Sequence, residues 1–532
     1  MKKRRGLAFF LGVIMILGVF SGCGDRGVNQ QQGSKVILNG DEIYPVQSED
    51  TLTYWMSLNP MLTTDYTNFA ETPLGMELEK RTGVKITYMH PQAGQANEQF
   101  NIMLAGDELT DMVQYGWNGY AGGPDKAIEE GYILKLNDIL KEYAPSLWAY
   151  LGDNPDIDKK VKTDGGNYYT IPFVRGEDWL TTYQGLILRK DWLDKAGKEV
   201  PTTLDELEDA LTIFKDEYAS GAPLMLMPAQ RNYIMYAHNI GEGFYLDGGD
   251  VKYGPTQPEY KDVLTRMKKW FDTGILDNNM VSMDSKYMSS KLLNSEAGAY
   301  YGAVVGGIGI NLDAKPDSVP EFDLVATPQV TLNATQKPEF GTKEDNVHLG
   351  VGIAIASKCK NVELAARFLD YGFTDEGYML YNFGIEGVSY NMENGEPILS
   401  ELLTNNPDGL SVTNVAPRYL RASYSGPFVQ DERYVEQSLA HPKQQLDAYQ
   451  KWSNTNMGEH ILPPITLLAG EMDEDATIMA NVKTYVDEMF VAFVTGREPI
   501  ENFDKYIAQV ENFGIGKSIQ MRQSALERYN NR

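Results

Sequence analysis

The sequence predicts an α/β protein with two lobes, each built on a mixed, mostly parallel sheet flanked by helices. Segments with strand character alternate with segments of helical periodicity, which is typical of a parallel sheet with helices on its faces. At 532 residues the chain is too long for one ordinary core. Its 42% hydrophobic and 23% charged residues indicate a globular chain rather than a disordered or membrane-embedded one.

The first 22 residues have the pattern of a secretion signal. Basic residues at positions 2–5 precede an apolar segment over residues 7–20, which is too short for a comfortable membrane span. Ser21-Gly22-Cys23 resembles a bacterial lipobox, although Phe20 stands where leucine is usual. This resemblance implies that residues 1–22 are removed and that Cys23 carries lipid, which anchors the protein to the extracellular face of the cell membrane. An uncleaved anchor or a plain secretory signal is the alternative.

The mature chain is strongly acidic and has no expected disulfide. Removal of the signal takes the formal net charge from −27 to −31. Such a surface repels nucleic acid and anionic lipid headgroups, so no nucleic-acid partner is expected. Cys359 has no partner once Cys23 carries lipid, and we expect a packed thiol rather than a nucleophile. Residues 23–46 begin with the lipidated cysteine and contain few large apolar residues. We expect them to form a flexible tether.

Two loops near the start of the first sheet are candidate ligand loops. The elements expected here, in order, are strand 51–56, helix 74–81 with Gly83 as its C-cap, strand 84–89, helix 98–104 and strand 112–115. In open α/β sheets ligands gather beyond the carboxyl ends of the strands. Trp55 and Asn59 follow the first strand, and Tyr115, Trp117 and Asn118 follow the third. Trp117 has glycines on both sides within two residues, which makes it the best ligand candidate.

The next segment leads toward the second lobe. Helices are expected at 126–130 and 133–143, and a strand at 168–173. Residues 153–158 (DNPDID) look superficially like a calcium loop, but they lack the mid-loop glycine and distal glutamate of an EF-hand, which favours a solvated turn. Arg175, Asp178 and Trp179 follow the strand and are candidate ligand residues.

The stretch from Tyr183 to Phe214 organises the rest of the chain. It predicts a buried strand at 185–188, a charged turn at 189–191 and a helix. Thr203 and Glu206 have the spacing of a capping box, and the apolar residues of the helix recur on one face: Leu204, Leu207, Leu211 and Phe214.

Two runs in this stretch resemble extracellular solute-binding proteins of the maltose-binding type. They are Leu-Arg-Lys-Asp-Trp-Leu-Asp-Lys at 188–195 and Val-Pro-Thr-Thr-Leu-Asp-Glu-Leu at 200–207, typical of large lipoprotein members that bind oligosaccharides for ABC importers. The resemblance implies a type II periplasmic-binding-protein-like fold with several crossovers between the lobes, the first of them at this strand. It continues through the Phe-Val-Thr-Gly run at 493–496.

The second half of the chain continues the alternation. The expected elements are strand 223–228, helix 232–240, hairpin 245–251, helices 258–271 and 285–294, strands 297–305, 322–328 and 348–356, and helices 362–371, 375–383, 439–452, 478–495 and 502–513. The resemblance implies a second crossover at 348–356 and a third between Asn391 and Arg421. The lobes would then comprise residues 46–185 plus 343–414, and 186–342 plus 415–532.

Motifs for catalysis and cofactors lack the required residues. The five histidines form no His-x-x-x-His pair, Gly516-Lys517-Ser518 lacks the first glycine of a Walker A loop, and residues 306–309 lack the third glycine of a dinucleotide fingerprint. No Gly-x-Ser-x-Gly elbow occurs. We therefore assign no catalytic residue, metal ligand or cofactor. A glycosidase pair of carboxylates stays open, because such a pair is spatial rather than sequential.

Aromatic and polar side chains near strand ends favour a carbohydrate ligand. The chain holds 32 Tyr and 7 Trp, and a sugar cleft combines aromatic faces with amide, carboxylate and guanidinium groups. Tyr245 and Tyr301 are candidates from the second lobe, and Arg421 and Tyr424 from an irregular loop. Core packing is the alternative for each aromatic residue. Arginines 175, 231 and 421 are candidates to pair with a sugar carboxylate.

The resemblance implies a lipid-anchored, monomeric solute-binding protein and not an enzyme. An oligosaccharide, including one with uronate units, would enter between open lobes, and closure would present it to the permease subunits of an ABC importer. The alternatives are an extracellular carbohydrate-active enzyme and a non-transport sensor or adhesion lipoprotein of the same fold.

Overall fold

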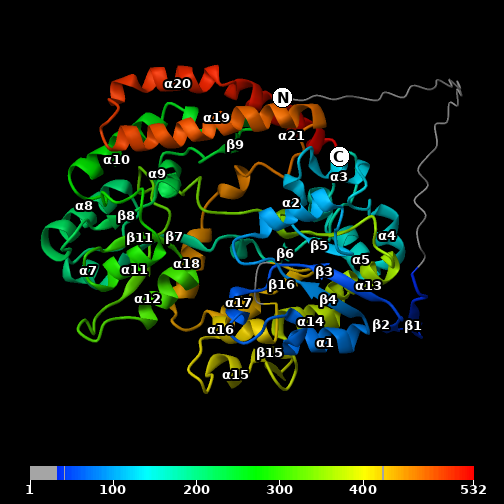
Figure 1. Ribbon diagram of the computed structural model, residues 1–532. Coiled ribbons are helices and arrows are strands. Elements are labelled where there is room, and N and C mark those ends of the chain that lie inside the picture. The colour runs from blue at the N-terminus through cyan, green and yellow to red at the C-terminus, as the bar shows by residue number, and fades with distance from the viewer. Residues whose placement is uncertain (1–32, 41, 422–424) are drawn as a thin grey trace, which may run out of the picture.

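Two four-stranded sheets, each with its own hydrophobic core, divide the chain into two lobes (Figure 1). The computed structural model describes residues 33–40, 42–421 and 425–532. The signal segment 1–22, the lipidation site Cys23 and the ligand candidate Tyr424 lie outside the described residues. The α/β class and the two-lobed architecture expected from the sequence are confirmed.

The sheet of the first lobe has the strand order β13-β5-β3-β4. β3 (Thr51–Trp55) pairs in parallel with β4 (Lys85–Met89) and β5 (Met112–Gln114), as the strand–helix alternation predicts. β13 (Ile353–Ile355) adds an antiparallel edge. The strand expected at 348–356 is therefore shorter, because a 3₁₀ turn occupies Leu349–Val351. Residues 168–173 contribute only isolated bridges instead of the expected strand.

Helices pack around this sheet. They are α1 (Pro73–Thr82), α2 (Ala96–Gly106), α3 (Gly123–Glu129), α4 (Asn137–Tyr143), α5 (Pro145–Asp153), α6 (Pro155–Lys160), α13 (Val362–Asp370) and α14 (Asp375–Phe383). Gly83 ends α1 at a φ of 74°, as expected of a glycine C-cap. The turn expected at 153–158 is instead the junction of α5 and α6, since the prolines at 145 and 155 each begin a helix. Cys359 is buried and free, and burial raises the pKa of its thiol to about 12.

The expected tether is shorter than residues 23–46. β1 (Ile37–Asn39) and β2 (Glu42–Gln47) form an antiparallel hairpin that belongs to the first lobe. The hydroxyl of Tyr44 donates to the Arg367 carbonyl at 2.6 Å, and Val46 is buried in the core. Composition does not predict this hairpin, because few residues of the segment are apolar. The residues that anchor it contact helices that are distant in the sequence.

The sheet of the second lobe has the order β12-β7-β11-β8 and is mixed. Two of its three strand pairings are antiparallel, so the expectation of a mostly parallel sheet is wrong for this lobe. β7 (Gln184–Arg189) runs antiparallel to both β11 (Ala299–Ala303) and β12 (Leu324–Ala326), and β8 (Leu224–Met225) is parallel to β11. β8, β11 and β12 lie within expected segments, and β7 extends the expected strand at 185–188 by one residue at each end. The apolar run at 297–305 leaves the sheet at Val304, where a π-helical turn begins.

Most helices of the second lobe lie near predicted segments, but those at 190–195 and 310–313 were not predicted, and the first of them occupies the expected charged turn. The helices of this lobe are α7 (Lys190–Lys195), α8 (Leu204–Ile213), α9 (Asn232–Ala237), α10 (Tyr260–Asp272), α11 (Ser285–Leu293), α12 (Ile310–Asp313) and α18 (Gln444–Ser453), together with the hairpin of β9 (Phe244–Asp247) and β10 (Asp250–Tyr253). The capping box of α8 is confirmed: Thr203 accepts from the Glu206 amide, and the Glu206 carboxylate accepts from the Thr203 amide.

Short elements at the bottom of Figure 1 connect the two cores. They are β14 (Tyr390–Glu393), β15 (Glu396–Leu399), α15 (Glu401–Thr404), α16 (Val412–Val415) and α17 (Glu432–Ser438).

Three C-terminal helices lie along the top of both lobes (Figure 1). They are α19 (Ala469–Val494), α20 (Phe503–Asn512) and α21 (Ile515–Asn530), of which the sequence analysis missed the last. α19 contacts α3 in the first lobe and α10 in the second. Arg528 and Arg532 form ion pairs with Asp164 of the first lobe. Within the described residues, no helix is both long and apolar enough to cross a membrane.

Candidate functional site

Three chain segments pass between the lobes side by side. β6 (Val174–Arg175) pairs in parallel with β16 (Val429–Gln430), and Val174 also bridges to Val347. The Gly176 amide donates to the Gln430 carbonyl at 3.1 Å. The segments at 174–175 and 429–430 run from the core of the first lobe to that of the second, and the segment at Val347 runs in the opposite direction. We call these segments the crossing strands. The sequence analysis expected the first at 185–188 and the third between 391 and 421, so both occur elsewhere.

A cavity of about 420 Å³ lies beside the crossing strands, between the lobes. Asn118 lines it from the first lobe, Phe244, Met457 and His460 line it from the second, and residues 343–350 form its floor. Asn118 lies in the short 3₁₀ turn Trp117–Gly119 that follows β5, as expected of a ligand residue beyond the carboxyl end of a strand.

An aromatic group from the second lobe stands next to this cavity. The rings of Phe340 and His460 stack with centroids 4.2 Å apart, and Tyr245 meets Phe340 edge-on at 5.3 Å. Nδ1 of His460 lies 2.8 Å from the Leu246 carbonyl, which fixes the imidazole on β9. Phe244 and His460 are half-buried, whereas Tyr245 is buried. The sequence indicated Tyr245 but not Phe340 or His460, because no local pattern marks contacts between residues that are far apart along the chain.

Charged groups line the crossing strands themselves. Arg175 is buried and forms an ion pair with Glu344 at 3.4 Å, and the hydroxyl of Tyr183 donates to the same carboxylate at 2.8 Å. Asp178 is exposed and pairs with Lys343 at 2.6 Å. Trp179 is half-buried and donates its indole N–H to Glu432 at 2.8 Å. The structure thus brings together the three residues that follow the expected strand at 168–173.

The aromatic residues of the two candidate loops point mostly into the core. Trp117 is fully buried, and its indole N–H donates to the Val113 carbonyl at 3.1 Å. Trp55 is also buried and packs on Phe100 of α2. Both residues are therefore core residues in this structure, and the placement of Trp117 corrects the expectation that it faces a ligand. Tyr115 is half-buried, stacks on Phe100 and donates to Asn97 at 2.9 Å.

Two further candidates have structural contacts of their own. The Asn59 side chain accepts from the Met61 amide and caps a short 3₁₀ turn. Tyr301 is buried on β11 opposite Leu186 and packs against Tyr233, and burial raises the pKa of its phenol well above the usual range.

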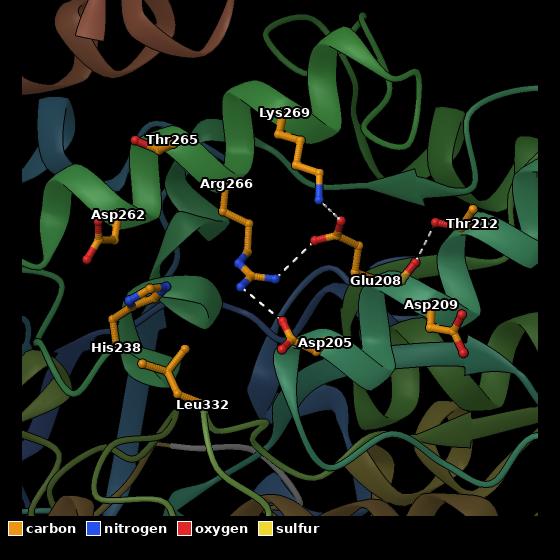
Figure 2. Close-up of a pocket in the computed structure, with 10 residues that line it drawn as sticks. All are labelled: Asp205, Glu208, Asp209, Thr212, His238, Asp262, Thr265, Arg266, Lys269 and Leu332. Carbon is orange, nitrogen blue, oxygen red and sulfur yellow. Dashed lines mark hydrogen bonds and ion pairs between the residues drawn. The ribbon is translucent and has the colours of Figure 1, made fainter. Parts of the chain in front are cut away.

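A larger cavity, of about 700 Å³, opens on the outer face of the second lobe (Figure 2). It lies between α8 and α10, where Arg266 bridges Asp205 and Glu208 at 3.1 and 3.0 Å and Lys269 also contacts Glu208. Its charged side chains pair mainly with one another. The helices that line it, α8 and α10, lie at the left of Figure 1, on the side of the second lobe away from β6 and β16. We therefore place the candidate site between the lobes. Among the described residues, no group of three or more His, Cys, Asp or Glu side chains could hold a metal ion.

Two sheet-centred lobes, joined by paired crossing strands with a cavity beside them, define the class of two-lobed solute receptors. The model of the bacterial extracellular solute-binding protein family matches residues 63–379. The chain belongs to this family, as the runs at 188–195 and 200–207 had indicated.

Curated relatives and solved structures agree with this assignment. The chain is 22% identical to the fructooligosaccharide ABC transporter substrate-binding protein FusA of Streptococcus pneumoniae, with 96% of each chain covered. It is 26% identical to the polygalacturonan/rhamnogalacturonan-binding protein YtcQ of Bacillus subtilis, over 59% of this chain and 63% of that protein. The structure of alginate-binding protein AlgQ2 without calcium ion shares the fold, with a TM-score of 0.71, 23% identity and coverage of 90% of this chain and 98% of that one.

Proposed function

We propose that this protein captures an oligosaccharide between its lobes and delivers it to an ABC importer. The observation that carries the proposal is the interlobe cavity beside three paired crossing strands, since such strands allow two lobes to close around a ligand. Relatives that match 96% and 59% of this chain are binding proteins for fructooligosaccharide and for polygalacturonan/rhamnogalacturonan. The family consists of binding proteins, which supports capture without turnover.

The contact residues that we propose combine half-buried rings with polar groups. Sugars pack their C–H faces on aromatic rings and direct their hydroxyls to polar side chains. The set retained from the sequence is Tyr115, Asn118, Arg175, Asp178, Trp179 and Arg421, and the set added from the structure is Tyr183, Phe244, Glu344 and His460. We place the lobe boundaries at the crossing strands, near residues 175, 347 and 429, and we propose that the protein is a monomer.

A thermal-shift screen tests the proposal. A glycan that binds only the folded state at 100 times its Kd should stabilise the protein by about 2.7 kcal/mol and raise its melting temperature. The panel includes kestose, maltotriose and trigalacturonate, with peptides as the comparison class. Asn118→Ala should reduce the shift, whereas Asn239→Ala, outside the site, should not. A flat response to every glycan combined with shifts from peptides would reject the substrate class, and shortened glycans after incubation would indicate an enzyme.

We also propose that lipid on Cys23 holds the protein at the extracellular face of the cell membrane. The basic n-region, the apolar segment and Ser21-Gly22-Cys23 support this. In a bacterial host that processes lipoproteins, wild-type protein should be recovered with membranes and label with palmitate. Cys23→Ser should do neither and should appear in the medium or soluble fraction, whereas Cys359→Ser should behave as wild type. Palmitate labelling of Cys23→Ser would contradict the assignment.

A further inference from the structure

Arg421 lies at the carboxyl edge of the first sheet, where three strands end. Its guanidinium Nη1 is 4.0 Å from the sulfur of Met56, which follows β3, and Nη2 is 3.5 Å from Oε1 of Gln114, the last residue of β5. His90, which follows β4, is held against the same edge through the Met56 carbonyl at 2.8 Å. Ligands of open α/β folds bind beyond this edge.

The charge of Arg421 has no carboxylate partner among the described residues, unlike that of the other buried arginines. Four of the five arginines that are buried in the described chain form ion pairs: Arg175 with Glu344, Arg189 with Asp191, Arg231 with Asp487 and Arg367 with Glu363. Arg421 is 8% exposed and meets only neutral acceptors, including the carbonyl and hydroxyl of Ser425 at 3.1 and 3.2 Å. A buried charge without a counter-ion is unfavourable.

The groups around Arg421 do not balance its positive charge. The guanidinium lies over the ring of Phe69 at 5.4 Å, a cation–π contact that lowers the cost of burial only in part. Burial lowers the pKa of His90, the hydrogen bond to Met56 opposes this, and the charge of Arg421 adds to the lowering. Gln114 and Ser425, which accept from Nη2 of Arg421, are only half-buried.

We propose that Arg421 binds the carboxylate of an acidic sugar unit, so that the transported oligosaccharide contains uronate. This inference rests on the proposed function and names its substrate class. A planar guanidinium matches a carboxylate through two parallel hydrogen bonds, and such a pair supplies the missing counter-ion. Gln114 and Ser425 have the polar groups to hold neighbouring sugar hydroxyls. Arg175 and Arg231, the other two arginines that the sequence singled out, already have acidic partners.

Calorimetric titration of the mature chain with matched trisaccharides tests the inference. The probes are the trimers of galacturonate, mannuronate and guluronate, the methyl ester of each, and the neutral sugars kestose and maltotriose. We expect at least one acid trimer to bind about 30-fold or more tightly than its methyl ester, because esterification leaves the buried charge unpaired. Arg421→Gln should remove this preference, and Arg421→Lys should restore part of it. Arg418→Gln is the control: Arg418 lies three residues before Arg421 and its guanidinium pairs with Asp65. This variant should keep the preference for the acid over the ester.

The outcomes separate this inference from the proposed function. Binding of neutral sugars with no preference for acids over esters would overturn the acidic subsite and leave oligosaccharide capture standing. Binding of no saccharide at all would reject both. An unchanged acid preference in Arg421→Gln would also overturn the role of Arg421. If Arg421→Gln does not fold, two measurements on the wild type still test the inference. One is the comparison of acid with ester, and the other is titration of His90 by NMR with and without the acid trimer. A carboxylate bound to Arg421 should raise the pKa of His90.

Discussion

Replacing Asp191 by alanine is expected to lower the free energy of unfolding by about 3–5 kcal/mol. Arg189 is fully buried, and its Nε and Nη2 donate to the two carboxylate oxygens of Asp191, both at 2.7 Å. The guanidinium lies between the rings of Trp192 and Phe322, at 4.5 and 4.4 Å. Without Asp191 a buried charge would have no counter-ion, and neither flanking ring replaces one.

Urea denaturation of wild type and two variants measures this effect. Asp194→Ala is the matched control on the same helix: its side chain is 60% exposed and contacts Lys190, so we expect a loss below about 0.5 kcal/mol. Replacing both partners, as Arg189→Met with Asp191→Leu, should recover much of the loss because no unpaired charge remains. Equal losses for Asp191→Ala and Asp194→Ala would show that the Arg189 pair does not stabilise the second lobe.

The same stretch shows what the sequence predicts and what it does not. The strand at 185–188 and the capped helix α8 follow from local patterns, and both are found at the expected residues. The pattern predicts a charged turn at 189–191, but β7 ends at Arg189, α7 begins at Lys190, and Arg189 and Asp191 are buried. Burial here depends on Leu292, Ser295 and Phe322, which lie more than 100 residues away along the chain. Local periodicity carries no information on such contacts.

In the candidate site, too, local patterns are predicted by the sequence and contacts between distant residues are not. The rule that ligands lie beyond strand ends located the loop with Asn118, which lines the interlobe cavity. The same rule did not give the orientation of Trp117, because the loop turns that ring toward Phe100 of α2. Phe244, Glu344 and His460 also line the interlobe cavity but could not be predicted, because they are far apart along the chain and only the fold brings them together. The spacing of strands and helices therefore predicts where a site lies more reliably than which side chains face it.

Gly176→Ala is expected to destabilise the crossing strands by about 1–3 kcal/mol, toward the upper end, and to weaken glycan binding. A Cβ at Gly176 would lie 2.4 Å from the Gln430 carbonyl oxygen, which accepts the Gly176 amide at 3.1 Å. Because the obstructing atom is backbone, the clash has no side chain to relieve it. β6 and β16 must separate, and the hydrogen bonds on which the proposed lobe closure depends are lost.

Gly350→Ala is the matched control, because it lies in the segment that lines the same cavity and its added Cβ would meet only His348 ring atoms, at 3.7 Å. It should keep wild-type stability, since an alanine that fits the native backbone restricts mainly the unfolded chain. Denaturation measures the stability of each variant, and small-angle scattering with and without the best glycan from the screen measures closure. If the lobes close on the crossing strands, Gly176→Ala should lose both stability and the glycan-dependent compaction while Gly350→Ala keeps them. Full compaction in Gly176→Ala would mean that the lobes close without the pairing of β6 with β16.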